Sequence, residues 1–136
     1  MIGDNAQFDA FVSEHRWAVL TTLRSDGSAS NSMVAYARDG DALVVSTPAR
    51  TLKVRTLCAD PRVTLTVISN AEPFNFVTIE GAAAVETEGL TQATRLVFAN
   101  LTDVGYAEPE DLDAWIVNDD RVIIRIAPQR VSGVIR

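Results

Sequence analysis

Residues 74–86 read FNFVTIEGAAAVE, and this uninterrupted run decides the fold. A single strand of 13 residues implies a strongly curled sheet, as in a β-barrel. Gly81 lies inside the run, and an interior glycine marks a bulge or a close approach of backbone or ligand. The stretch therefore predicts a curled sheet with an irregularity near Gly81.

Outward from this run, the chain alternates short β-branched and aromatic segments with turn residues. Turns are predicted at residues 25–27 and 39–40, where glycine follows aspartate. Pro128 interrupts the last segment, which predicts two separate strands there. The further predicted strands are 17–24, 29–37, 42–46, 62–68, 121–126 and 130–135. Six or seven antiparallel strands with peripheral helices indicate a mainly β protein built as a small barrel.

Helical periodicity is confined to short stretches between these strands. The expected helices are 4–14, 91–104 and 109–118, together with one that follows Thr47. Thr47 is suited to cap that helix and Pro48 to begin it, since proline at the first position loses no needed donor. Residues 1–136 show no linker or repeat and are expected to form one domain.

The segment from Ser46 to Pro61, STPARTLKVRTLCADP, combines hydroxyl groups with three cations, Arg50, Lys53 and Arg55. Hydroxyls, cations and a helix N-terminus together favour a phosphate ligand. An alternative reading is an ordinary surface helix with Val54, Leu57 and Cys58 facing inward. The segment alone does not decide between the two.

Composition excludes several function classes. The net charge of −6 argues against non-specific nucleic-acid binding, and no apolar run is long enough to span a membrane. One cysteine and one histidine argue against a disulfide and a transition-metal site. Without a signal peptide, a cytoplasmic location is expected, with Cys58 as a buried thiol.

Motifs for self-sufficient chemistry are also missing from the sequence. We find no hydrolytic triad, no P-loop and no dinucleotide-binding glycine pattern. No catalytic side chain is therefore assigned. An enzyme of this kind would rely on a cofactor for its reaction.

Four segments in order carry a family resemblance: WAVLTTLRSDG from Trp17, ASNSMVAYARDGDALVVST from Ala29, ARTLKVRTLCADPRV from Ala49, and FNFVTIEGAAAVE from Phe74. In this order they resemble the pyridoxamine-5′-phosphate-oxidase-like split-barrel flavoproteins. The resemblance is strongest to the actinobacterial branch that uses the deazaflavin coenzyme F420. It implies an FMN-binding-like split barrel and a homodimer with two cofactor sites at the subunit interface.

The resemblance also implies which residues hold the cofactor. Its phosphate would lie against residues 46–53, where Ser46 and Thr47 supply hydroxyls and backbone donors and Lys53 the main cation. The arginine often found two residues before this lysine is Thr51 here, and Arg50 is the nearest substitute.

Other positions are expected at the ring of the cofactor. Asn31 matches a strand position that approaches the ring, and its amide can both donate and accept. Phe74 and Phe76, with the adjoining Val77, match the place where the partner subunit covers the ring or substrate. Phe74 replaces a tryptophan often seen there. Weaker candidates for lining the pocket are Met33, Tyr36 and Trp115.

Three functions remain open from the sequence. The first is a reductase that passes a hydride from reduced F420 to a small unsaturated organic substrate. The second keeps the barrel but uses FMN. The third is a protein that binds or stores F420 without turnover. Three cations favour F420, because its phosphodiester and glutamate tail form a longer anion than the single phosphate of FMN.

Overall fold

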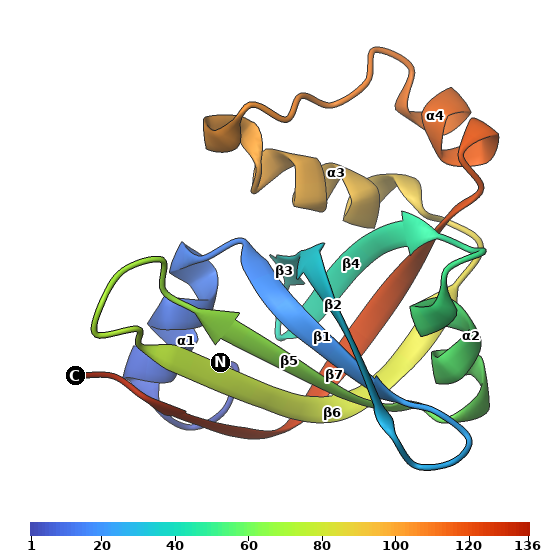
Figure 1. Cartoon of the computed structure of the whole chain (residues 1–136). Coiled ribbons are helices and arrows are strands. Elements are labelled where there is room, and N and C mark those ends of the chain that lie inside the picture. Colours follow the sequence, from blue (N-terminus) through green and yellow to red (C-terminus); the bar gives the residue numbers. More distant parts are fainter.

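The computed structural model describes residues 1–136 and shows one antiparallel sheet of seven strands, curled into a half-open barrel (Figure 1). The spatial order is β2-β1-β5-β6-β7-β4-β3. The strands are β1 (Trp17–Leu23), β2 (Ala29–Ala35), β3 (Ala37–Asp39), β4 (Ala42–Pro48), β5 (Arg62–Ile68), β6 (Phe76–Glu86) and β7 (Arg121–Val134). The mainly β, antiparallel fold predicted from the sequence is confirmed.

The two longest strands, β6 and β7, form the curled middle of the sheet. They pair from Phe76–Val134 to Glu86–Ile123, with one register shift between Glu80 and Gly81. At this shift Gly81 faces Pro128, and Gln129 is the extra residue of β7. The prediction of an irregularity at Gly81 is therefore confirmed.

The predicted break at Pro128 is wrong, because β7 runs continuously from Arg121 to Val134. Pro128 lies at the bulge, where the ladder is already disrupted and a missing N–H donor costs little. The expected single strand 29–37 is also divided, into β2 and the short β3, which begins again at Ala37.

Four α-helices and one 3-10 turn surround the sheet. They are α1 (Ala6–Glu14), α2 (Leu52–Ala59), α3 (Thr91–Ala99), η1 (Thr102–Val104) and α4 (Leu112–Asn118). The chain between β6 and β7 carries α3 and α4, which lie together on one side of the sheet in Figure 1. None of the helices is long and apolar enough to cross a bilayer.

The start of α2 differs from the prediction. Pro48 still belongs to β4, where it pairs with Arg121, and α2 begins at Leu52 with Thr51 at the N-cap position. β3 pairs only with residues 42–44 of β4, so the end of β4 has a neighbour on one side only. A proline is tolerated at such an edge because its missing N–H breaks no ladder bond.

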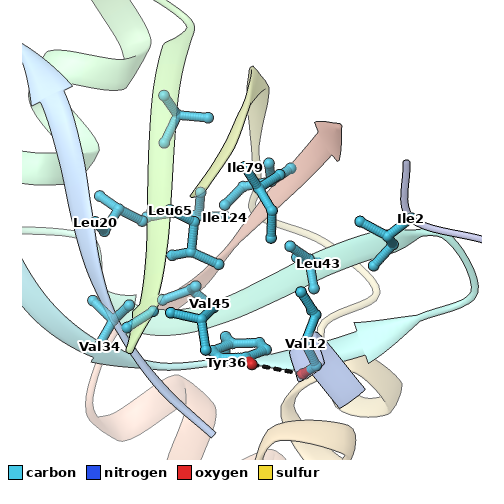
Figure 2. Packing of buried hydrophobic residues seen from close by; sticks show 14 of the residues in the cluster. Ile2, Val12, Leu20, Val34, Tyr36, Leu43, Val45, Leu65, Ile79 and Ile124 are labelled. Atoms are coloured by element: carbon cyan, nitrogen blue, oxygen red, sulfur yellow. Dashed lines mark hydrogen bonds between the residues drawn. The ribbon is translucent and has the colours of Figure 1, made fainter. Parts of the chain in front are cut away.

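The main core fills the inside of the curl (Figure 2). Leu20, Leu65, Ile79 and Ile124 come from four strands and are fully buried. A second, smaller cluster lies on the other face of β4, where α3 packs against Val44 and Ile123. The sheet is thus covered on its outer face at β4, and this covering layer creates the hollow described next.

Candidate functional site

A hollow of about 340 Å³ lies between the outer face of the sheet and the layer formed by α3 and α4. Apolar and aromatic side chains make up most of its wall, and Lys53 and Arg121 are its only charged residues. The residues on the sheet side are Trp17, Met33, Val34, Ala35, Ser46, Thr47 and Arg121. The residues on the side of α3 and α4 are Val97, Phe98, Leu101, Tyr106 and Trp115. Lys53 of α2 also lines the hollow.

Lys53 is half-buried in this hollow, in the first turn of α2. Burial lowers the pKa of its ammonium, and the nearby positive charge of Arg121 lowers this pKa further. No carboxylate offsets either effect on the pKa. A partly desolvated cation without a counter-ion is a natural binding partner for an anion.

Arg121, the first residue of β7, pairs with Pro48 of β4, and its side chain reaches Ser46 two residues earlier on that strand. Its Nε donates to Ser46 Oγ at 3.2 Å, and its Nη2 donates to the Ser46 carbonyl oxygen at 3.0 Å. Nη1 forms an ion pair with Asp119 Oδ2 at 3.0 Å. The guanidinium is thereby held at the wall of the hollow.

Aromatic side chains form contacts between the helical side of the hollow and the sheet. The guanidinium carbon of Arg121 lies 4.6 Å from the centre of the Trp115 ring, a cation–π contact. Phe98 meets Trp115 edge to face, with ring centres 5.3 Å apart. Tyr106 meets Trp17 in the same way at 5.9 Å. The hollow therefore has an aromatic wall and a cationic end, which suits a planar ligand with an anionic group.

A larger hollow of about 500 Å³ lies between the end of α1 and the turn after β5. It contains the carboxylates of Glu14 and Asp103 as well as Arg16. Mixed charges of this kind do not select an anion, so we place the candidate site at Lys53 and Arg121.

The structure gathers part of the segment 46–53 at the hollow. Ser46, Thr47 and Lys53 line it. Thr47 is buried, and its hydroxyl oxygen lies 3.4 Å from the hydroxyl oxygen of Thr51. The Thr51 hydroxyl donates a hydrogen bond to the Pro48 carbonyl oxygen at 3.1 Å. Thr51 thus holds the turn before α2.

The remaining cations of this segment point outward. The side chain of Arg50 is 69% exposed, and its Nη2 lies 3.9 Å from Asp119 Oδ1, outside the lining of the hollow. Arg55 is exposed on α2 and makes no ion pair. Cys58 is exposed too, so the prediction of a buried thiol is wrong.

The residues expected near the ring lie on other parts of the sheet. Asn31 is exposed on β2, where its Oδ1 accepts a hydrogen bond from Thr21 Oγ1 at 2.6 Å. Phe74 is 49% exposed just before β6, and Phe76 is half-buried at its first position. Val77 is fully buried in the core. None of the four lines the hollow within one chain.

Among the weaker candidates, Met33 and Trp115 line the hollow. Tyr36 does not, because it is fully buried and its hydroxyl donates to the Val12 carbonyl oxygen at 2.6 Å. Sequence reasoning missed Arg121, Trp17, Phe98 and Tyr106. For Arg121 the deciding fact is the register that places β7 beside Ser46, which a single sequence does not display.

Comparison with known proteins gives the family. The family model described as Pyridoxamine 5′-phosphate oxidase matches residues 5–135. No curated protein matches the chain.

Three solved structures with this fold belong to an F420 reductase, a FAD-binding protein and a haem storage protein. An F420 reductase has a TM-score of 0.76 and 21% identity, and the match covers 95% of this chain and 98% of that chain. A FAD-binding protein from Mesorhizobium loti has a TM-score of 0.73 and 20% identity over 96% and 94%. A haem storage protein from Vibrio cholerae has a TM-score of 0.70 and 17% identity over 93% and 91%. At these identities the likeness concerns the fold.

Proposed function

The chain belongs to the pyridoxamine 5′-phosphate oxidase family, and from this premise we propose that it is an F420H2-dependent reductase of a small unsaturated organic substrate. The single observation that carries the proposal is Lys53, a half-buried ammonium without a counter-ion at the end of an aromatic-walled hollow. The similar fold of an F420 reductase supports it.

In this proposal the residues of the hollow bind and orient the cofactor. Lys53 pairs with its phosphate, and the Ser46 hydroxyl, already fixed by Arg121, adds a hydrogen bond. When bound, reduced F420 supplies a hydride for an unsaturated bond. The aromatic wall excludes water from the ring, so positioning and desolvation are the contribution of the protein.

We further propose that the active form is a homodimer. The outer face of the sheet carries a row of residues across five strands, from Met33 of β2 through Val19, Thr66 and Thr78 to Ser132 of β7. None of them is buried in the single chain. Asn31 and Phe76 lie two residues from Met33 and Thr78 of this row, and Phe74 precedes Phe76 just before β6; in a dimer these side chains would be brought towards the partner's cofactor.

Two alternatives are each favoured by one structural neighbour. The FAD-binding protein favours a flavin such as FMN in place of F420. The haem storage protein favours a role in which a ligand is held without turnover. In both alternatives the same residues would hold the anionic group of the ligand.

Titration of the purified protein with F420, FMN and haem, followed by absorbance and fluorescence, separates these functions. We expect colourless protein that binds F420 more tightly than FMN or haem, and that oxidises bound F420H2 only when an unsaturated substrate is added. Yellow protein with FMN absorbance as purified would contradict the choice of cofactor. Tight F420 binding without oxidation across a broad substrate screen would favour storage.

A further inference from the structure

Arg121 has hydrogen-bonding capacity that the protein leaves unused. A guanidinium has five N–H donors, and three of those of Arg121 are taken by Ser46 Oγ, the Ser46 carbonyl oxygen and Asp119 Oδ2. Its side chain is only 18% exposed and forms part of the wall of the hollow. Each of its three nitrogens already has one partner, and the two remaining N–H groups, one on Nη1 and one on Nη2, are available to a ligand in the hollow.

The guanidinium is also held in place before any ligand arrives. Trp115 lies against it at 4.6 Å, β4 accepts two of its hydrogen bonds, and Asp119 accepts the third. A rigid fork loses little conformational freedom when it binds two oxygens of one anion. Lys53, by contrast, is a flexible point charge at the same hollow.

The positive charges at the hollow are not fully neutralised by carboxylates of the protein. Asp119 is the one carboxylate that forms an ion pair with Arg121, at 3.0 Å, and Arg50, which lies outside the hollow, also approaches it at 3.9 Å. Lys53 has no such partner. The cationic end of the hollow therefore keeps a net positive charge after its own ion pairs are formed.

We propose that Arg121 is the residue that makes this site specific for a phosphate ester, by donating its two free N–H groups to phosphate oxygens beside Lys53. This inference rests on the proposed function in one respect: it assumes that the phosphate belongs to the cofactor. Asp119 then acts as a positioning residue, since it holds the guanidinium without lining the hollow, while Trp115 both packs against the guanidinium and lines the hollow.

The test compares ligands with and without the phosphate: FMN and riboflavin differ only in this group, whereas the F420 fragment also lacks the tail beyond it. FMN is paired with riboflavin, and F420 with its ring-and-ribityl fragment, for the wild type and for Arg121→Gln and Arg121→Lys. Arg95→Gln is the matched control, because Arg95 is also an ion-paired arginine but lies exposed on α3 away from the hollow. Circular dichroism checks the fold, and Arg121→Lys, which keeps the charge, serves if Arg121→Gln does not fold.

We expect Arg121→Gln to bind the phosphate-bearing ligand of each pair about tenfold more weakly or worse, and the phosphate-free ligand unchanged. Arg121→Lys should fall between this variant and the wild type, and Arg95→Gln should match the wild type. Equal losses for both ligands of a pair, or no loss at all, would overturn the inference while leaving the proposed function standing.

A second experiment tests the role of Arg121 if the proposed function proves wrong. If the wild type binds neither F420 nor FMN, the probe is inorganic pyrophosphate, followed by tryptophan fluorescence, because Trp115 lies against Arg121. Pyrophosphate binding that is lost in Arg121→Gln would support the role of Arg121 without the cofactor. Binding that is unchanged in the variant, or absent from the wild type, would overturn it.

Discussion

Lys53 is a lysine that the protein keeps partly out of water without supplying a carboxylate. Such an arrangement costs stability, because both desolvation and the charge of Arg121 act against the protonated ammonium. A bound phosphate would offset both. At the proposed anion site, the stability of the free protein and the affinity for the ligand would therefore oppose each other.

Replacing Lys53 by alanine tests this point directly. We expect Lys53→Ala to weaken F420 binding about tenfold to hundredfold, because it removes one charge-assisted bond to phosphate, and to leave the fold intact. Arg55→Ala is the matched control, since Arg55 is an exposed cation of the same helix with no ion pair. Fluorescence titration gives both affinities. Wild-type affinity in Lys53→Ala would contradict the assignment.

The lowered pKa of Lys53 also predicts how binding depends on pH. As the pH rises through this lowered pKa towards 10.5, the free protein loses the ammonium proton and affinity for F420 should fall; below the window it should be constant. Protonated Lys53 is unfavourable in the folded state, so the free energy of unfolding should rise over the same window.

Lys53→Arg is the control for the pH experiment, because a guanidinium stays charged throughout. Titrations at several alkaline pH values should show a decline for the wild type and a flat profile for this variant. A parallel decline in both proteins would assign the pH dependence to another group.

At the level of single residues, the sequence indicates cations and hydroxyls but not their directions. Lys53 and Ser46 stand in a recognisable segment, and both line the hollow. Arg50 and Arg55 stand in the same segment yet are exposed, because Arg50 lies in the turn before α2 and Arg55 lies on the exposed side of that helix. Arg121 lies 75 residues from Ser46 in the chain, so only the paired strands bring them together.

Among the elements, α1 shows how a helix end is satisfied without a glycine. The last four carbonyl groups of a helix lack partners within it. His15 Nδ1 lies 2.7 Å from the Phe11 carbonyl oxygen, and the Tyr36 hydroxyl donates to that of Val12 (Figure 2). Burial raises the pKa of Tyr36, so the hydroxyl keeps its proton.

Tyr36→Phe should therefore destabilise the protein by about 1–3 kcal/mol, because it leaves the buried Val12 carbonyl without this partner. Tyr106→Phe is the control, since the side chain of Tyr106 is 52% exposed and its hydroxyl makes no hydrogen bond within the chain. Urea unfolding followed by circular dichroism measures both. Equal stability of the two variants would show that the Val12 bond contributes nothing.

The bulge between β6 and β7 gives a second prediction at this scale. A Cβ on Gly81 would collide with the Ala127 carbonyl oxygen, a backbone atom that cannot rotate away. Gly81→Ala should cost about 1–3 kcal/mol of stability or more. Ala84→Ser, at an exposed position of the same strand, should be close to neutral in thermal unfolding. A neutral Gly81→Ala would mean that the bulge can widen.

The types of the elements were predictable from the sequence. The boundary of a strand was predicted wrongly where two unusual residues lie opposite each other in the sheet. Pro128 predicts a break, and Gly81 predicts a bulge. The structure pairs the two across one ladder, so that a single irregularity accommodates both and β7 continues. Local reasoning treats each residue alone, and only the strand pairing reveals the compensation.

At the scale of the whole molecule, the sheet has two faces with different neighbours. The concave face encloses the core, while the outer face is covered by α3 only around β4 (Figure 1). Over β1, β5 and β6 the outer face presents Val19, Thr66 and Thr78, none of them buried. The family resemblance predicted this curled architecture, but a single chain does not reveal what covers the open face.

We expect a second copy of the chain to cover it, and Thr66→Arg tests this expectation. An arginine at the centre of the row would be solvated in a single chain but would disrupt close packing between two sheets. Analytical ultracentrifugation should show a dimer for the wild type and a monomer for Thr66→Arg. Gln92→Arg, on the exposed side of α3, is the control and should remain dimeric.

Cofactor binding should weaken together with the dimer, since Phe74 and Phe76 lie outside the hollow of their own chain and, in the proposed dimer, would cover the cofactor of the partner. Thr66→Arg should therefore bind F420 more weakly, although Lys53, Ser46 and Arg121 are unchanged. A wild type that sediments as a monomer and binds F420 tightly would refute the shared site. A monomeric Thr66→Arg with wild-type affinity would place the whole site within one chain, between the sheet and the α3–α4 layer.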